Sequence, residues 1–305
     1  MGSIVVNKLS KSNFETKCFV SLVKFCLRLL ALLPLPVLRA IGTLHGRILY
    51  WMKSRSARTS DINISLCYPQ LSTEERSLFV QRSLVATGRS VYETAPIWYW
   101  QQNSLENLIV DFQGLELLQQ TLAQSAVIAI CPHWGNWEVC SFALGGKFPT
   151  KILFDERRLG AFKAQVSSAR SRFGISMVPI NFGGLRALIK SLDQGDLVII
   201  LPDQVPTRGT QLLVDFMGVK AQTTTIVHSL TQKHNVEIVM LTIERVKQGF
   251  FVRVEPASDK LKHEDAVIAT QCLNDEVARV IQRDPTQYQW EYKRFRRVPG
   301  VDVYA

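Results

Sequence analysis

The sequence predicts an α/β fold, with a single mixed sheet flanked by helices and N-terminal membrane-associated helices before it. Short runs of branched apolar residues alternate with helical segments from residue 115 onward, which is typical of a sheet covered by helices. Two strand patterns follow each other directly after residue 235 and predict an antiparallel pair. Residues 18–52 are mostly apolar. We therefore expect N-terminal membrane-associated helices in residues 1–58 and one α/β domain in residues 59–305.

The first predicted helix covers residues 18–33, in which Lys24 and Arg28 lie four residues apart on one face. A helix that spans a membrane needs about 20 uninterrupted apolar residues, so this shorter segment is predicted to lie in the membrane interface. Residues 37–52 repeat the pattern, and Arg39, Gly46 and Arg47 are expected to face away from its apolar side. In the alternative interpretation, both helices simply pack onto the globular domain.

Charge and cysteine content narrow the partners and the cellular compartment. The net charge of +10 favours anionic partners, and the basic cluster at Lys53, Arg55 and Arg58 predicts contact with the cytoplasmic surface of an anionic membrane. Nucleic-acid binding is not predicted, because the basic residues are scattered and form no recognition motif. Six cysteines without a CxxC pair indicate free thiols in a reducing compartment.

The remaining elements follow from hydrophobic period and turn residues. A long helix is predicted to begin at Ser72 or Thr73, with Glu74 and Glu75 in its first turn, and to end near the aromatic patch at residues 97–100. Further helices are predicted for residues 115–124, 136–146, 159–173, 183–194, 221–234 and 263–283. Strands are predicted for residues 125–131, 151–154, 175–180, 197–202, 236–246 and 250–255.

The best indication of chemistry lies where the strand at residues 125–131 ends and a helix is predicted to begin with Asn136 as its N-cap. His133 precedes this helix and Glu138 falls in its first turn. We expect Glu138 to accept a hydrogen bond from one ring nitrogen of His133, which leaves the other nitrogen free as a base. The spacing alone is weak, and the alternative is that Glu138 complements the helix dipole while His133 bonds to backbone.

Two further residues are candidates for the same site. Asp203 follows a second buried strand, so it should emerge at the same sheet edge as His133, where it orients a substrate or an arginine, or is only a turn residue. Arg170 is the member of a basic stretch that we single out, because a buried guanidinium can hold a phosphate or stabilise an oxyanion. The other members are predicted to form mostly a solvated face: Arg157, Arg158, Lys163 and Arg172.

Several familiar motifs are absent from the sequence. It contains no G-x-S-x-G elbow, no G-x-G-x-x-G, no Walker loop and no H-E-x-x-H. A serine acyl-enzyme, a dinucleotide cofactor and a catalytic zinc are therefore disfavoured, and neither a cofactor nor a metal is expected.

Several segments together resemble the lysophospholipid acyltransferase superfamily and, within it, the late (secondary) acyltransferases of lipid A biosynthesis, the lauroyl and myristoyl transferase family. These segments are HWGNWE at residues 133–138, LPDQ at 201–204, DFMG at 215–218 with the threonines at 223–225, and QYQWEYKRF at 287–295. Residues 63–76 also match, so the resemblance covers nearly the whole chain. It implies a glycerolipid acyltransferase-like fold.

The resemblance implies an enzyme on the cytoplasmic face of the cell inner membrane. Such an enzyme moves an acyl chain from acyl carrier protein to a hydroxyl on an acyl chain of a lipid A precursor. His133 and Glu138 match the family's HX4D/E pair, and Arg170 lies where related enzymes carry a functional arginine. Residues 155–157 differ from the tyrosine-arginine-proline run of many relatives, which puts substrate contacts there in question.

From the residues we expect direct acyl transfer without a covalent enzyme intermediate, because no activated Ser or Cys is evident. The oxyanion would be stabilised by Arg170, by the helix start at Asn136, or by both. Three alternatives remain open: a glycerophospholipid acyltransferase, a hydrolase that releases fatty acid from an acyl thioester, and a non-catalytic basic membrane-binding module.

Overall fold

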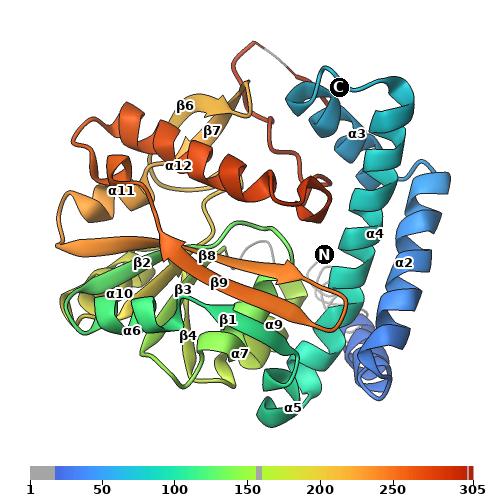
Figure 1. The fold of residues 1–305 in the computed structure, drawn as a ribbon, viewed down its shortest axis with the longest axis horizontal. Coiled ribbons are helices and arrows are strands. Elements are labelled where there is room, and N and C mark those ends of the chain that lie inside the picture. Colours follow the sequence, from blue (N-terminus) through green and yellow to red (C-terminus); the bar gives the residue numbers. More distant parts are fainter. Residues whose placement is uncertain (1–17, 156–159, 301, 305) are drawn as a thin grey trace, which may run out of the picture.

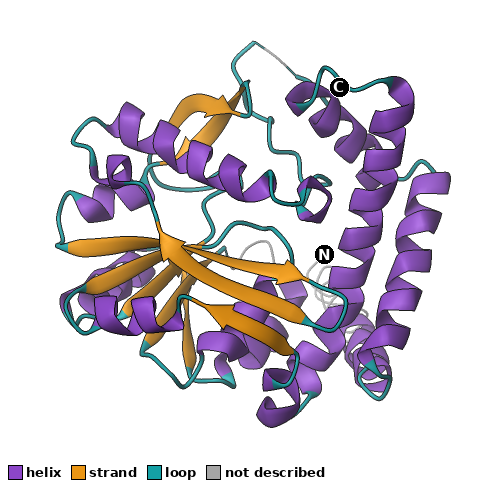
Figure 2. Cartoon of the chain, in the orientation of Figure 1, coloured by secondary structure: helices purple, strands orange, loops and turns teal. Residues whose placement is uncertain are grey.

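The centre of the computed structural model is a seven-stranded mixed sheet with helices on both faces (Figures 1 and 2). The structure describes residues 18–155, 160–300 and 302–304. The strand order is β1-β9-β8-β2-β5-β3-β4. The strands are β1 (Ile109–Gln113), β2 (Ala126–Ile130), β3 (Thr150–Phe154), β4 (Ile175–Pro179), β5 (Leu197–Ile200), β8 (Val236–Arg245) and β9 (Phe250–Pro256). Strand β9 runs antiparallel to β8, as the sequence predicted, whereas the other neighbours pair in parallel.

Strands β2 and β5 form the centre of the sheet because every one of their side chains is apolar and buried. A strand covered on both faces reads as a continuous apolar run rather than an alternating one. Ile128 and Ile130 point to the core on the side of α10 (Phe182–Asp193) and α12 (Ala266–Ile281), whereas Val127 and Ala129 point to the core that contains α6 (Leu115–Leu122) and α7 (Cys140–Leu144).

One predicted helix was partly wrong. Residues 221–224, predicted as the start of a helix over residues 221–234, belong to strand β7 (Val219–Thr224), which pairs antiparallel with β6 (Gln211–Phe216). Met217 and Gly218 make the two-residue turn, and both have positive φ angles, 52° and 82°, as tight hairpins require. Only α11 (Ile226–Thr231) is helical. The hairpin is a separate two-stranded sheet, so the prediction of a single sheet was also incomplete.

Four helices outside the sheet span residues 35–106: α2 (Leu35–Trp51), α3 (Arg55–Cys67), α4 (Thr73–Tyr99) and α5 (Gln102–Glu106). Ser72 caps α4, with a capping box formed with Glu75. Helices α2 and α4 run side by side at one edge of the molecule (Figure 1). Two short α-helices and a 3₁₀ turn complete the framework of the site: α9 (Lys163–Ser171), α7 and η1 (Trp137–Val139).

Glycines bring α2 and α4 into backbone contact. A Cβ atom on Gly46 would lie 2.3 Å from the carbonyl oxygen of Leu84, and one on Gly88 would lie 2.2 Å from that of Gly42. Gly46, which we placed opposite the apolar side of this helix, is therefore buried in the same interface as Leu38. Four other large apolar residues of α2 point outward instead: Val37, Leu44, Ile48 and Trp51.

The outward apolar residues continue along the N-terminal segment, where residues 18–30 are helical. The exposed set is Phe19, Leu22, Phe25, Leu29, Leu32, Val37, Leu44, Ile48, Trp51 and Met52. We call it the apolar ridge. No helix in residues 18–155, 160–300 or 302–304 combines the length and the apolar character needed to cross a bilayer.

Candidate active site

The candidate site lies at the carboxyl ends of the two central strands. Ile130 at the end of β2 is paired with Ile200 at the end of β5, so the residues that follow both strands emerge together. In an open α/β sheet this edge is where ligands bind. The arrangement brings His133 and Asp203 into contact, although they are 70 residues apart.

Asp203 contacts both the ring and the backbone of His133. Its Oδ1 lies 2.8 Å from Nδ1 of His133, and its Oδ2 accepts a hydrogen bond of 2.9 Å from the backbone N–H of the same residue. Burial opposes ionisation of Asp203, but the charge of His133 and these hydrogen bonds outweigh it and lower the pKa of Asp203. An ionised carboxylate at Nδ1 keeps the proton there and leaves Nε2 free to act as a base.

Glu138 pairs with Arg170 rather than with His133. Arg170 Nε donates to Glu138 Oε2 at 2.9 Å and Nη2 donates to Oε1, which makes a bidentate pair. Burial disfavours the charged guanidinium, but Glu138 more than offsets this and raises the pKa of Arg170. Among the described residues, the side-chain partner of His133 is Asp203, so the predicted hydrogen bond from His133 to Glu138 is absent.

The absence of a hydrogen bond between His133 and Glu138 has a local cause. We expected an α-helix from Asn136, but Glu138 lies in the 3₁₀ turn η1, and α7 begins only at Cys140. The Asn136 side chain does not cap this turn and instead donates to Glu93 Oε2 at 2.8 Å. Stabilisation of an oxyanion by a helix start at Asn136 loses its basis, because the helix that follows has only five residues and a small dipole.

Trp137 connects the two pairs. Its ring lies edge-to-face against the His133 ring with centroids 5.2 Å apart, and the Arg170 guanidinium carbon lies 4.7 Å from the Trp137 ring centroid. Sequence reasoning did not single out this residue, although an aromatic side chain between a candidate base and a candidate acid was a usable signal. His133, Trp137, Glu138 and Arg170 thus form one wall.

That wall faces a cavity of about 840 Å³, within the range of about 300–1,000 Å³ that is usual for small-molecule sites. Beyond the polar wall the lining is largely apolar, and includes Ile152, Leu153, Leu185, Ile189, Leu201 and Ile226. Trp98, from the aromatic patch at the end of α4, also lines it, while Ile97 is buried in the core. A long apolar chain with a polar group at one end matches this lining.

Two cysteines lie beside the turn but are poor nucleophiles. Cys131 and Cys140 are both buried, and burial raises the pKa of each thiol, that of Cys140 to about 12. A thiol attacks as its thiolate, which is scarce under these conditions. Within the described part of the chain, no group of three or more His, Cys, Asp or Glu side chains is placed to hold a metal ion.

Of the basic stretch, Arg157 and Arg158 lie outside the described residues. Arg172 donates hydrogen bonds to the carbonyl oxygens of Trp98 and Trp100, so it ties α9 to the end of α4.

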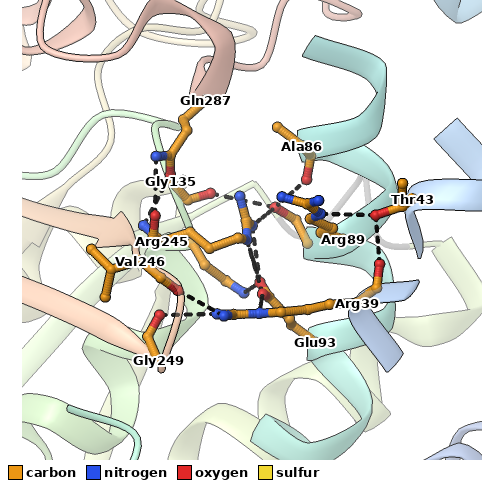
Figure 3. A network of polar contacts seen from close by, with 12 residues as sticks. Arg39, Thr43, Ala86, Arg89, Glu93, Gly135, Arg245, Val246, Gly249 and Gln287 are labelled. Carbon is orange, nitrogen blue, oxygen red and sulfur yellow. Dashed lines mark hydrogen bonds and ion pairs between the residues drawn. The ribbon is translucent and has the colours of Figure 1, made fainter. Parts of the chain in front are cut away.

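A second polar centre lies directly behind the turn (Figure 3). Glu93 of α4 is fully buried and accepts hydrogen bonds from Arg39 Nε at 2.6 Å, Arg245 Nε at 2.8 Å and Asn136 Nδ2. Burial raises the pKa of Glu93, but Arg245 and Arg39 outweigh this effect, so the net shift is downward. No sequence motif indicates Glu93, because its partners are far away along the chain.

Glycine completes the turn between the two centres. Gly135 has a φ angle of 64°, and a Cβ atom there would lie 1.7 Å from the carbonyl oxygen of Ile243. The turn after β2 is therefore held by the sheet on one side and by Glu93, through Asn136, on the other.

Comparison with known proteins agrees with this architecture. The family model described as bacterial lipid A biosynthesis acyltransferase matches residues 7–297. The palmitoleoyltransferase of lipid A biosynthesis from Escherichia coli (strain K12) is 24% identical over 271 residues, which are 88% of this chain and 87% of that protein. The myristoyltransferase of the same organism is 26% identical over 270 residues, 87% of this chain and 82% of that protein. The lauroyltransferase is 24% identical, over 88% of both chains. The chain is therefore an acyltransferase that belongs to the bacterial lipid A biosynthesis acyltransferase family.

Proposed function

We propose that this protein transfers a fatty acyl chain from acyl carrier protein directly to a hydroxyl on an acyl chain of a lipid A precursor. The relatives are named as acyltransferases of lipid A biosynthesis. The observation that carries the proposal is a histidine whose Nδ1 contacts a buried carboxylate and whose ring lines a largely apolar cavity.

In the proposed reaction, His133 Nε2 removes the proton from the acceptor hydroxyl while the oxygen attacks the thioester carbonyl carbon. The tetrahedral intermediate then collapses, the carbon–sulfur bond breaks, and the imidazolium returns its proton to the leaving thiolate. One ester and one free thiol result, and no group on the enzyme is acylated. Asp203 keeps the ring in the tautomer that this sequence of proton transfers requires.

Arg170 is the proposed stabiliser of the oxyanion. Its Nε and Nη2 donate hydrogen bonds to Glu138. Within the described residues, the Arg170 side chain donates to no other acceptor. Nη1 therefore remains as a donor at the cavity wall. In this arrangement Glu138 is a positioning residue for Arg170 rather than the partner of the base.

Membrane attachment and the acyl donor are also part of the proposal. The apolar ridge gives the N-terminal helices a surface to bury in one leaflet. The adjacent cations Arg47, Lys53, Arg55 and Arg58 suit an anionic cytoplasmic leaflet of the inner membrane. The net charge of +10 likewise favours an acidic carrier protein as the donor.

The test is transfer of a labelled acyl group from acyl carrier protein to a lipid A precursor by the purified full-length protein. His133→Ala should lower the rate on the order of 10²-fold or more, because the base is lost. His263→Ala is the matched control, since His263 is exposed and lies outside the cavity. A wild-type rate in His133→Ala would contradict the proposal.

The same assay separates the alternatives. Release of free fatty acid at a rate that does not depend on acceptor would indicate a hydrolase. Transfer to lysophospholipid but not to the lipid A precursor would indicate a glycerophospholipid acyltransferase. Trapping an acylated enzyme would rule out direct transfer.

A further inference from the structure

A second hollow, separate from the acyl cavity, lies between α2, α4 and the turn from β8 to β9. It has a volume of about 820 Å³. Six cationic side chains line it: Arg39, Arg47, Arg82, Arg89, Arg245 and Lys247. We call this hollow the arginine groove. The segment at residues 287–289 separates it from the cavity at His133, because Gln287 lines the groove whereas Gln289 lines that cavity.

The positive charge in the arginine groove exceeds the negative charge. Glu93 is neutralised by Arg39 and Arg245 (Figure 3). The other carboxylate, that of Asp284, accepts hydrogen bonds from Thr286 and Gln287. Among the described residues no carboxylate pairs with the four remaining cations, which are Arg47, Arg82, Arg89 and Lys247.

Arg89 shows how this surplus affects one group. Its Nε donates to Thr43 Oγ1 at 2.9 Å, and no other side-chain hydrogen bond of Arg89 is formed with a described residue. Burial lowers the pKa of Arg89, and repulsion from Arg245 and Arg39 lowers it further. An anion in the groove would relieve this repulsion and would accept hydrogen bonds from the free ends of the guanidinium groups.

Phosphate is the anion that this chemistry favours. A guanidinium presents two parallel N–H donors that match two phosphate oxygens, and three arginines without carboxylate partners share the hollow. An acidic protein would instead dock over a broad surface of about 800 Å² on each partner, rather than enter a concave site.

The position of the arginine groove indicates where the phosphate comes from. Helix α2 supplies Arg39, Thr43 and Arg47 to the groove, while its exposed flank carries Leu44, Ile48 and Trp51 of the apolar ridge. One helix thus borders both a surface suited to lipid and a surface suited to phosphate. We propose that the arginine groove binds the phosphate group of a lipid headgroup at the membrane surface. This inference rests on the proposed membrane-bound function.

The experiment compares vesicle binding by the full-length protein and by Arg82→Gln/Arg89→Gln. Arg39 and Arg245 are left intact because they neutralise the buried Glu93. Arg186→Gln/Lys190→Gln is the matched control, since it removes two exposed cations from α10, outside the groove. Circular dichroism and thermal unfolding verify that all variants fold.

The vesicles contain phosphatidylcholine alone, or phosphatidylcholine with phosphatidylglycerol, with a phosphorylated lipid A precursor, or with the same precursor after removal of its phosphates. The groove variant should bind vesicles with net anionic phosphate, from phosphatidylglycerol or from the phosphorylated precursor, at least about tenfold more weakly than wild type, because hydrogen bonds between charged groups are lost. Phosphatidylcholine alone, whose phosphate is balanced by the choline ammonium, is the reference. The control should stay near wild type. A deficit restricted to the phosphorylated precursor identifies the acceptor as the phosphate source, and a deficit that includes phosphatidylglycerol identifies the bilayer phospholipid.

Three results would overturn the proposal. Equal deficits in the groove variant and the α10 control would show a general charge effect. Unchanged binding to every vesicle would show that the groove takes no phosphate. A loss of affinity for acyl carrier protein alone, measured by fluorescence anisotropy, would assign the groove to the carrier. Binding is measured without turnover, so failure of acyl transfer in wild type is a separate result.

Discussion

The two carboxylate centres on either side of the Gly135 turn are both buried but differ in the number of hydrogen bonds they have formed. Asp203 leaves one ring nitrogen of His133 uncommitted, and that ring lines a cavity. Glu93 is enclosed and contacts two arginines and one amide. The first arrangement suits proton transfer to a substrate, whereas the second keeps the turn in place. The presence of a buried charge does not distinguish a centre suited to proton transfer from one that only supports the fold. The distinguishing property is a hydrogen-bonding atom that is still without a partner.

The largest effect is expected on stability at the buried centre. Glu93→Ala leaves two guanidinium groups and one amide without their acceptor, which should lower the free energy of unfolding by about 3–5 kcal/mol. Urea denaturation measures it. Glu237→Ala breaks a half-exposed pair with Lys262 and serves as control, with a change within about 1 kcal/mol. Equal changes in the free energy of unfolding for the two variants would show that Glu93 does not stabilise the turn more than an ordinary surface pair does.

The next effect is on rate at the open centre. Asp203→Asn keeps the size of the side chain but removes the charge that fixes the His133 tautomer, so kcat should fall on the order of 10²-fold. The free energy of unfolding should change much less than in Glu93→Ala. Steady-state kinetics and urea denaturation of the same preparation provide both values. An unchanged kcat would show that Asp203 does not support the base.

A smaller effect is expected at Arg170. Arg170→Lys keeps the charge but loses the two-pronged bond to Glu138, so kcat should fall by about tenfold while the KM for the acyl donor changes little. Arg186→Lys on exposed α10 is the control. A change in KM alone would assign Arg170 to ground-state binding instead of the oxyanion.

The smallest effect is the dependence of stability on pH. Folding lowers the pKa of Glu93 below its ordinary value of 4.5, so the associated stability is present above that pH and is lost as the pH falls below it. The slope from one such group is at most about 1.4 kcal/mol per pH unit. Unfolding measured from pH 6 to 3 should be less steep in Glu93→Gln than in wild type. Parallel curves would mean that folding does not lower the pKa of Glu93.

The local pattern of apolar and turn residues predicted much of the fold. Strands β2 and β5 are continuous apolar runs bounded by polar turns. The antiparallel pair β8 and β9 was predicted because two strand patterns follow each other directly along the chain. The hairpin of β6 and β7 was missed because residues 221–234 were interpreted as one helix. The turn at Met217 and Gly218 makes this segment a hairpin rather than a helix. Met217 has a positive φ angle there, which its residue type does not predict.

The candidate site was predictable as a set of residues but not as a set of contacts. His133 and Asp203 were both placed at one sheet edge, yet their pairing depends on β2 and β5 being neighbours, which the order of strands along the chain does not give. The spacing of His133 and Glu138 predicted a hydrogen bond between them, but Glu138 pairs with Arg170, 32 residues further along the chain. Glu93 had no motif at all, since its partners lie 43, 54 and 152 residues away.

The glycine contacts between α2 and α4 have a consequence for the choice of acceptor. Backbone meets backbone at Gly42, Gly46 and Gly88, so the first helix has no soft layer of side chains on which to slide or tilt. With α2 resting on the bilayer as proposed, the height of the proposed base, His133, above the lipid surface becomes a constant of the fold. Hydroxyl groups would then be selected by how far they stand from the plane of the membrane.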